Sequence, residues 1–436
     1  MAEILPFRGV LYDPAKVDEI AQVVAPPYDV IGPAEQAALH ARHPYNVIRL
    51  ELGQEHKEDT PQNNRYSRAK RCLDEWLSAG ILRRDDRPAL YLYSIGYRLR
   101  SGQERTLRGF LSLVTLEEFD SGGIFPHENT RAAAKSDRYR LLEACRSNFS
   151  PIYSLYADPE GRVIRHLDKA VDEEGPRIDT AGDGVRHRLW TVDDPAVIAE
   201  VGALMKPLPL FIADGHHRYE SALRYRNAQR EAHGPGGRLA SDLVLMFCSN
   251  LDDPGLTILP THRLIPPPAP CSPTELRQRL TGAFTIKTFP FTKDTERETR
   301  RRFLTALQAA QSTSEHVIGL VARGELRYDL LTLNEQGLAK LGSSTRERLD
   351  VSILQHLVLR EAMRMTPQDE DRILYLKDEE ETLAAVSRGE GELAFLLNPP
   401  KITEVKDVAR AGDRMPHKST YFSPKPLTGL VINIME

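Results

Sequence analysis

The sequence predicts an α+β fold of mixed α/β character, because two kinds of local pattern alternate along it. Short runs rich in β-branched and aromatic residues, bounded by glycine, proline or charged clusters, are typical of strands. In the first half of the chain such runs cover residues 89–93, 107–116, 151–156 and 208–213. Stretches with apolar residues at helical spacing lie between them, at residues 65–78 and 136–145. These elements predict a front α+β domain over residues 1–265.

A proline-rich stretch supplies the clearest boundary in the sequence. Five prolines fall between residues 266 and 273, where neither a helix interior nor a central strand tolerates them. Beyond them, predicted helices at 273–280 and 294–311 and strands at 316–322 and 326–333 indicate an α/β insertion or second domain over residues 273–348. Further strands, at 373–376, 393–397, 419–422 and 429–434, alternate with helices in a C-terminal α/β segment, residues 349–436. We expect that segment to pack back on the core.

Composition limits the class of protein. With 436 residues, 41% of them hydrophobic, the chain can form more than one core, and its net charge of −4 gives no general attraction to nucleic acid. No apolar run is long enough to span a membrane, and the first residues do not resemble a secretory signal, so we expect a cytoplasmic protein. The four cysteines lie far apart without a C-x-x-C pair, which favours reduced, buried thiols over a zinc or disulfide framework.

The chemistry is concentrated at one turn, where an apolar run ends and Asp214-Gly215-His216-His217-Arg218 passes into residues with helical spacing. Asp214 is the predicted N-cap, and Gly215 allows close backbone approach. The N–H groups of a first helical turn favour an anion, so a phosphate fits here, with Arg218 gripping two of its oxygens. Under that hypothesis Arg218→Lys removes activity but leaves folding unchanged. The alternative is that Asp214 only caps the helix while the histidines pack or face solvent.

A second polar cluster follows residue 126. His127, Glu128 and Thr130 are followed closely by Lys135 and Arg138, in a predicted loop and helix start. Such residues can supply acid–base groups and neutralise phosphate charge. The alternative is a solvated helix entrance, since runs of charge usually face water. A zinc helix is excluded, because the His127-Glu128 pair lacks a second histidine at the required spacing.

Two further segments carry candidate residues. The prolines of APPYDVI, residues 25–31, fix an extended backbone that either holds Tyr28 and Asp29 toward a pocket or forms a plain turn. His262 and Arg263 lie just before the proline-rich stretch and are candidates for a further anion contact. We expect the segments at 25–31 and 126–130 to converge on the turn that contains Arg218, as walls of one site.

Several of these segments together resemble one known family. They are Pro6-Phe7-Arg8-Gly9, APPYDVI at 25–31, PHENT at 126–130, ADGHHRYE at 213–220, LPTHR at 259–263 and MPHKSTYFSPK at 415–425. Six ordered motifs resemble the family known as domain of unknown function 1015, over nearly the whole chain. The D-G-H-H-R turn is also similar to one in free serine kinases of the ParB/sulfiredoxin-like fold, which phosphorylate L-serine to O-phosphoserine. One branch of the family is understood to use pyrophosphate as the phosphoryl donor.

The resemblance implies a ParB/sulfiredoxin-like core with an additional C-terminal α/β region. The catalytic residues that it implies are Asp214, His216, Glu128 and Asp29, and it leaves open which carboxylate is the base. Of the substrate-binding and phosphate-binding candidates, the resemblance implies His217 and Arg218. The polar residues described above add Gly215, His127, Thr130, Lys135, Arg138, His262 and Arg263. The region after the proline-rich stretch has no counterpart in those kinases, and we expect it to cap the site or to serve in a homodimer.

The function implied is phosphoryl transfer to a small molecule, as in a free L-serine kinase with pyrophosphate, ATP or ADP as the donor. Mg²⁺ is the expected cofactor, because it usually bridges the donor phosphates, and no metal ligand is assigned. The chain lacks a P-loop and the protein-kinase motifs, which favours a small or unusual donor. Two alternatives stay open: a metal-dependent phosphatase or nuclease, and a non-catalytic ParB-like protein that binds nucleic acid. Neither a membrane nor, given the balanced charge, nucleic acid is an expected partner.

Overall fold

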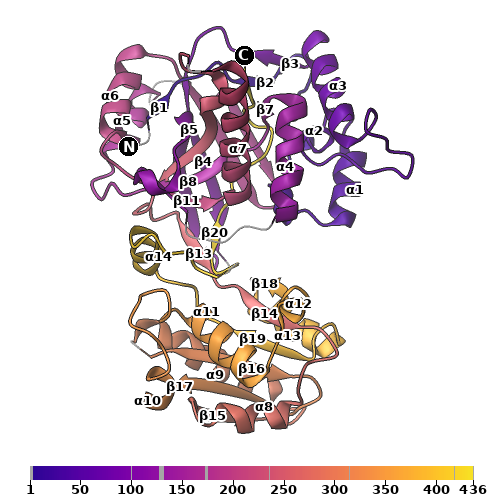
Figure 1. Cartoon of the computed structure of the whole chain (residues 1–436), viewed down its shortest axis with the longest axis vertical. Coiled ribbons are helices and arrows are strands. Elements are labelled where there is room, and N and C mark those ends of the chain that lie inside the picture. The colour runs from indigo at the N-terminus through magenta and orange to yellow at the C-terminus, as the bar shows by residue number, and fades with distance from the viewer. Residues whose placement is uncertain are drawn as a thin grey trace. The chain divides into compact units, whose positions relative to one another are not determined.

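The computed structural model describes residues 3–99, 101–126, 132–171, 175–234, 236–313, 315–416 and 418–435. Contacts between residues divide these into two compact units, which Figure 1 shows with their helices and strands labelled. The first unit holds the described residues up to 126, those from 132 to 257, and those from 424 onward. The second unit holds the described residues from 258 to 423. The chain therefore leaves the first unit after residue 257 and returns to it at residue 424.

A nine-stranded mixed sheet forms the centre of the first unit, in the order β6-β11-β8-β12-β5-β4-β10-β9, with β1 paired to β5. The strands are β1 (Ile4–Leu5), β4 (Leu90–Arg98), β5 (Glu104–Thr115), β6 (Ile124–Phe125), β8 (Ile152–Tyr156), β9 (Ile178–Gly182), β10 (Val185–Val192), β11 (Leu210–Asp214) and β12 (Leu243–Asn250). Strand β11 is antiparallel to β8 and parallel to β6. The four strands predicted in this half of the chain are confirmed, although β4 continues farther than its pattern indicated.

Helices cover this sheet, and the one that follows β11 packs beside α4 (Figure 1). The helices are α1 (Pro33–Arg42), α2 (Ile48–Glu51), α3 (Arg65–Ser78), α4 (Ala132–Cys145), α5 (Arg162–Ala170), α6 (Pro195–Met205) and α7 (His216–His233). Helix α3 has the predicted bounds because Asn64 caps it and its apolar residues Ala69, Leu73 and Trp76 share one buried face. The first unit thus has the mixed α and β structure that the sequence predicts.

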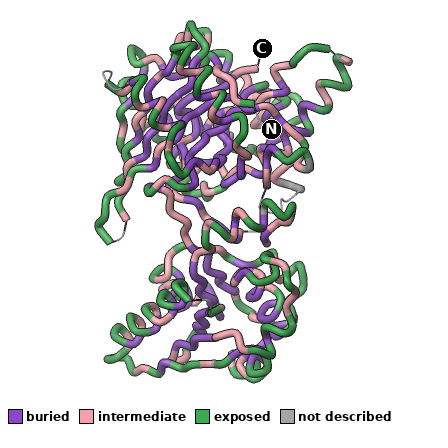
Figure 2. The backbone as a smooth tube through the Cα atoms, turned by 90° about the vertical axis from the view of Figure 1, so that its left-hand side faces the viewer, coloured by how far each residue is buried: buried purple, intermediate pink, exposed green. Residues whose placement is uncertain are grey.

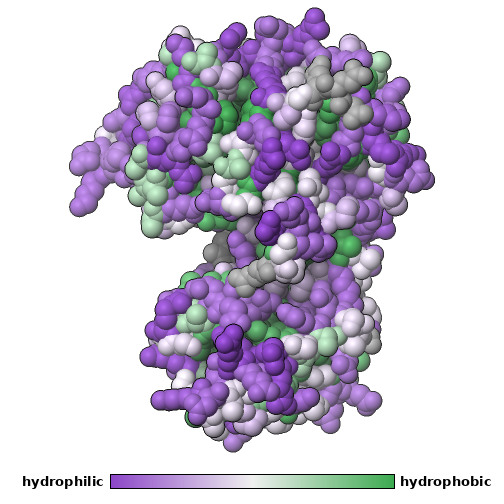
Figure 3. All heavy atoms as spheres, turned by 180° about the vertical axis from the view of Figure 1, so that it is seen from behind, coloured by the Kyte–Doolittle hydropathy of each residue, from purple (hydrophilic) through white to green (hydrophobic). Residues whose placement is uncertain are grey.

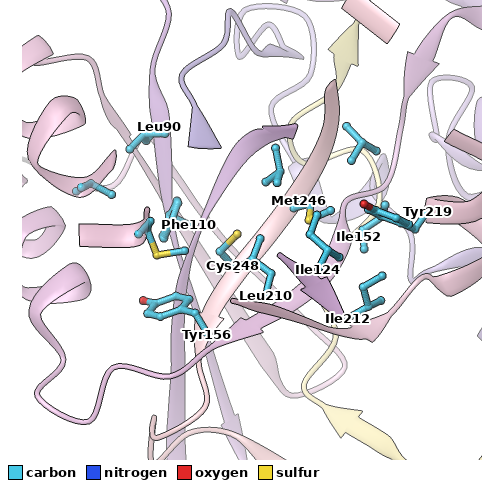
Figure 4. Close-up of a cluster of buried hydrophobic side chains, with 14 of the residues drawn as sticks. Leu90, Phe110, Ile124, Ile152, Tyr156, Leu210, Ile212, Tyr219, Met246 and Cys248 are labelled. Carbon is cyan, nitrogen blue, oxygen red and sulfur yellow. The ribbon is translucent and has the colours of Figure 1, made fainter. Parts of the chain in front are cut away.

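One apolar cluster fixes the strand and the helix on either side of the D-G-H-H-R turn. Leu210 and Ile212 of β11 and Tyr219 of α7 lie within it, and each is at most 1% exposed. Figure 4 shows these side chains beside those of neighbouring strands, including Ile152 of β8. The Tyr219 hydroxyl also donates to the carbonyl of Glu117 at 2.7 Å. Burial on both sides holds the turn in place, because a shift of either element would expose apolar surface.

The second unit is built on a six-stranded antiparallel sheet with the order β15-β17-β16-β19-β14-β18. Its strands are β14 (His262–Ile265), β15 (Phe284–Pro290), β16 (Val317–Ala322), β17 (Arg327–Leu333), β18 (Leu374–Leu376) and β19 (Leu393–Leu396), and β13 (Thr257–Leu259) pairs separately with β20 (Tyr421–Ser423). Its helices are α8 (Pro273–Leu280), α9 (Glu296–Ala309), α10 (Glu335–Leu338), α11 (Asp350–Ile353), α12 (Pro367–Glu370), α13 (Glu379–Arg388) and α14 (Ile402–Arg410), with a π-helical segment at Leu354–Ala362. Figure 2 shows buried residues gathered in the interior of each unit, with exposed residues around them.

The domain division differs from the one expected from the prolines. The proline-rich stretch lies inside the second unit, between β14 and α8, and β14 pairs with strands from residues 374–376 and 393–396. The parts expected at 273–348 and 349–436 therefore share one sheet. Prolines prevent regular structure locally, but they do not determine which sheet the flanking strands join. Of the segment expected at 349–436, the residues from 424 onward belong to the first unit, where β21 (Asn433–Ile434) pairs with β7 (Ser147–Asn148).

Hydrophilic residues predominate on the face of each unit seen in Figure 3, with apolar side chains in small groups between them. Within the described residues, no helix combines the length and the apolar composition needed to cross a bilayer.

Candidate functional site

The D-G-H-H-R turn joins β11 directly to α7, as the change in periodicity predicts, and α7 continues to His233. Gly215 is the N-cap residue and has a φ of +95°, in the left-handed region that favours glycine. The pairing of β11 with β8 shifts register between Ile212 and Asp214, which indicates a bulge. Bulges re-aim side chains and are frequent beside active sites. The prediction that Asp214 caps the helix is wrong, because this residue ends the strand and Gly215 takes the cap position.

Arg218 folds back over the turn. Its Nη2 donates to Asp214 Oδ2 at 2.7 Å, its Nη1 donates to the carbonyl of Pro151, and its side chain is only 10% exposed. A Cβ added to Gly215 would lie 2.9–3.0 Å from the Nε, Cζ and Nη2 atoms of Arg218, so the glycine is required for space as well as for φ. In this structure both terminal nitrogens of Arg218 are bonded within the protein, and its contact with a phosphate stays a prediction. Two of its donors hold the protein, and the residue orients the carboxylate of Asp214.

Lys425 is the main site residue that sequence reasoning missed. Its Nζ donates to Asp214 Oδ1 and lies 3.5 Å from Asp29 Oδ2, so one ammonium bridges two carboxylates. The three side chains are 8%, 14% and 23% exposed for Lys425, Asp214 and Asp29. The segment 25–31 does converge on the turn, through this lysine. The signal was present in the sequence, because Lys425 ends the family motif at 415–425.

Main-chain hydrogen bonds fix the segment that carries Lys425, residues 424–429. Thr428 N donates to the carbonyl of Ala25 at 2.8 Å, Ala25 N donates back at 3.2 Å, and the Thr428 hydroxyl donates to the carbonyl of Pro26. Leu427 N donates to the hydroxyl of Tyr93 at 3.3 Å. We call residues 424–429 the C-terminal strap. It pairs with the residues that precede Asp29, so the lysine and this carboxylate are positioned by the same backbone contacts.

Tyr28 lies between two arginines. The guanidinium of Arg138 stacks over its ring at 4.0 Å, a distance typical of a cation–π contact. Burial raises the pKa of the Tyr28 phenol well above its usual value, while the charges of Arg138 and Arg218 act in the opposite direction. The phenol is therefore neutral at physiological pH. The residue that precedes Asp29 is thus packed in place rather than free to move.

Arg138 is buried, and its guanidinium contacts carboxylates of the protein. It is 5% exposed, and its Nη1 donates to the carbonyl oxygen and to Oε1 of Glu51, each at 3.0 Å, while its Nε donates to Asp137 at 2.7 Å. Ser150 Oγ donates to the same Glu51 oxygen at 3.0 Å. These donors offset the charge of Glu51 and Asp137, and a phosphate contact of Arg138 stays a prediction. A buried ion pair of this kind is costly to break. It also fixes the guanidinium that stacks on the Tyr28 ring.

Lys135 also has a partner inside the protein. Its Nζ donates to Glu220 Oε2 at 2.8 Å, and Ser221 Oγ donates to its carbonyl oxygen at 3.0 Å. These contacts join the start of α4 to the first two turns of α7. Lys135 thus forms an ion pair between two helices, and its contact with a phosphate stays a prediction. Of the two histidines in the turn, His216 is buried, at 6% exposed, and His217 is half-buried.

His262 and Arg263 belong to the second unit, where they lie on β14. His262 is fully buried, and its Nδ1 accepts the N–H of Leu397 at 3.2 Å. Burial lowers its pKa to about 3, and the neighbouring Arg263 contributes, so the ring is neutral at physiological pH. Arg263 is 4% exposed and donates to the carbonyls of Thr261 and Lys418. The anion contact expected here is not supported, because a neutral buried ring and an arginine bound to backbone oxygens stabilise the strand.

Three predicted site residues, His127, Glu128 and Thr130, lie outside the described residues. Among those that are described, no three His, Cys, Asp or Glu side chains are grouped so that they could hold a metal ion. Asp214 and Asp29 are two carboxylates of the kind that Mg²⁺ prefers, but the ammonium of Lys425 lies between them. The pair does not fit a metal ion in this arrangement. The described site offers the carboxylates of Asp214 and Asp29 beside the cations of Arg218 and Lys425 at the start of a helix.

The chain belongs to the family described as "Protein of unknown function (DUF1015)", which matches residues 4–352. No curated protein matches. Among solved structures, a conserved hypothetical protein from Pyrococcus furiosus is 14% identical, with a TM-score of 0.35 over 73% of this chain and 94% of its own. A free serine kinase in complex with AMP is 13% identical, with a TM-score of 0.36 over 73% of this chain and 90% of its own. SbnI from Staphylococcus aureus, truncated at its C-terminus, is 13% identical, with a TM-score of 0.35 over 73% and 85%. Similarity of this degree does not assign an activity.

Proposed function

We propose that this member of the DUF1015 family is a small-molecule phosphotransferase that phosphorylates free L-serine, with pyrophosphate, ATP or ADP as the donor. The proposal extends the resemblance of the D-G-H-H-R turn to that of free serine kinases. It includes the ParB/sulfiredoxin-like core that this resemblance implies. The observation that carries it is the carboxylate of Asp214, held at the start of α7 by Arg218 and Lys425 and sharing that lysine with Asp29.

Phosphoryl transfer to a hydroxyl gives a specific reason for this arrangement. The serine oxygen forms a bond to phosphorus, the bond from phosphorus to the leaving phosphate oxygen breaks, and the hydroxyl proton passes to a base. Asp214, Asp29 and Glu128 are the candidate bases, and an ionised carboxylate is required for that role. The positive charges at the turn offset the negative charge of the donor, and His216 and His217 are the candidates for phosphate contacts in the first turn of the helix.

The direct test is ³¹P NMR of the purified full chain with L-serine and one donor at a time: pyrophosphate, ATP or ADP, each with and without Mg²⁺. The expected result is an O-phosphoserine resonance that grows as one donor is consumed and that is absent without L-serine. Release of orthophosphate at the same rate with and without L-serine would instead indicate a phosphatase. Consumption of none of the three donors would remove the proposal.

A further inference from the structure

The ammonium of Lys425 is shared by two carboxylates, those of Asp214 and Asp29. The ammonium is 8% exposed, and burying a lysine to that extent is unfavourable unless negative charge compensates. Two carboxylates, Asp214 and Asp29, approach it from different segments of the chain. A cation bridged by oxygens of two carboxylates is also the arrangement that a divalent metal ion adopts in phosphoryl-transfer sites. The lysine therefore lies where such an ion would otherwise be held.

We propose that Lys425 is the resident cation of the Asp214 and Asp29 carboxylates, so that the free protein does not bind a divalent metal ion at this pair. The lysine is a positioning residue, because its ammonium holds the two carboxylates side by side. Where the proposed phosphotransferase function holds, a divalent ion enters with the phosphates of the donor, which bind it themselves. The proposal concerns this carboxylate pair alone, and its metal-binding part is independent of any turnover.

The backbone contacts of the C-terminal strap make this assignment specific to Lys425. The strap is hydrogen-bonded to Ala25 and Pro26, and Asp29 follows a few residues later. Asp214 is held from its other side by Arg218, which is itself fixed to the carbonyl of Pro151. Asp214 is thus oriented by a group other than the lysine, and the backbone before Asp29 is held by the strap. We expect removal of the ammonium to leave the two carboxylates in place without the cation between them.

The experiment measures binding of Mn²⁺ alone, by the loss of its free EPR signal, to the full chain without substrate or donor. The variants are Lys425→Ala, Lys425→Ala combined with Asp214→Asn, and the control Lys70→Ala. Lys70 also pairs with an aspartate, Asp74, but at an exposed position 43% accessible to solvent. We expect weak binding to the natural sequence and to Lys70→Ala, and at least about tenfold tighter binding to Lys425→Ala. The added Asp214→Asn change should abolish that gain, because it removes one of the two anionic ligands.

Two results would overturn the proposal. One is tight Mn²⁺ binding to the natural sequence that Asp214→Asn abolishes, since the metal would then displace the lysine. The other is a folded Lys425→Ala protein, verified by its circular dichroism and thermal melt, that gains no Mn²⁺ affinity. If Lys425→Ala does not fold, Lys425→Gln removes the charge with less loss of volume, and the same comparison applies. Failure of the kinase assay alone leaves these binding results unchanged, so the two proposals fail separately.

Discussion

Two strand-to-helix turns in the first unit are built from the same parts and use them differently. Strand β8 leads through Asp158 and Gly161 into α5, as β11 leads through Asp214 and Gly215 into α7, and both glycines have a positive φ at the N-cap. In each turn the aspartate faces an arginine four residues later. The α5 turn is a matched reference for the α7 turn within one molecule.

The partners of the two aspartates differ. Asp158 is 1% exposed and accepts the N–H of Val163 at 2.9 Å. Arg162 is half exposed, and its Nε lies at the longer distance of 3.5 Å from Asp158 Oδ1. Its carboxylate therefore stabilises the start of the helix. Asp214 instead faces two cations, Arg218 and Lys425, both at most 10% exposed. Because α5 starts without buried cations, the burial of two of them at the α7 turn is not needed to begin a helix, and it indicates a functional site.

The largest expected difference between the turns is in catalysis. Asp214→Asn should reduce the rate of O-phosphoserine formation by roughly 10²-fold or more, because it removes the charge that Arg218 and Lys425 hold in place. Asp158→Asn retains an oxygen that can accept the N–H of Val163, so activity should change by less than about twofold. Steady-state kinetics by ³¹P NMR or a coupled assay measure both. Equal losses in the two variants would show that the turns are not functionally distinct.

The arginines give the second comparison. Arg218→Lys cannot donate to the carbonyl of Pro151 and to Asp214 together, so we expect a roughly 10²-fold loss of activity and a loss of about 1–3 kcal/mol in the free energy of unfolding. The loss of stability revises the expectation from sequence, in which folding was unchanged. Arg162→Lys, at a half-exposed position, should cost less than about 0.5 kcal/mol. Urea denaturation of both variants measures the difference. If the midpoint of unfolding is the same for Arg218→Lys as for the natural sequence, Arg218 binds ligand and does not stabilise the fold.

Substitution of the two N-cap glycines distinguishes the cost of a positive φ from the cost of crowding by a new side chain. Gly215→Ala and Gly161→Ala both place a side chain at positive φ, which costs about 1–2 kcal/mol. The new Cβ at 161 would meet only a side-chain nitrogen of Arg165, at 3.9 Å, whereas at 215 it would displace Arg218. Gly215→Ala should therefore be the less stable variant and should also lose activity. Thermal melts with activity assays test this, and equal effects at both positions would mean that only φ matters.

The smallest expected effect is a pH dependence that reaches the C-terminal strap. His187 Nδ1 accepts the hydroxyl of Tyr93 at 2.7 Å, and the same hydroxyl accepts Leu427 N–H. Burial lowers the pKa of His187 to about 4, so acidification protonates the unfolded chain first. Stability contributed by the neutral ring is complete above about pH 6.5 and decreases as the pH falls toward 4, by about 1–2 kcal/mol at pH 5.

His187→Gln should remove this share of the pH dependence, because glutamine retains an acceptor for Tyr93 and does not titrate. The measurement is the free energy of unfolding by urea at pH 7.5 and pH 5 for both proteins. The difference between the two pH values should be smaller in the variant by that same amount. Parallel losses in the two proteins would assign the acid sensitivity to other groups.

Local patterns predicted the elements around the site, and long-range partners decided its chemistry. The transition from β11 to α7 was predictable because apolar periodicity changes at Asp214. The cap assignment was wrong because an aspartate before a helix can either cap the helix or pair with a cation. Asp214 pairs with Lys425, which lies 211 residues away in the chain. Arg138 and Lys135 were assigned to phosphate for the same reason, since their carboxylate partners lie 87 and 85 residues away. Sequence alone gives the charges at a site but not how they pair.

The C-terminal strap has a consequence for the order of synthesis. Residues 424–429 contact Ala25 and Pro26, which are synthesised far earlier, and they carry the lysine that reaches Asp29. Between these two segments the ribosome makes the whole of the second unit. Until residue 425 has been made, Asp214 and Asp29 lack the ammonium that they share in the folded protein. Assembly of the charge cluster is thus coupled to translation of residues beyond 423.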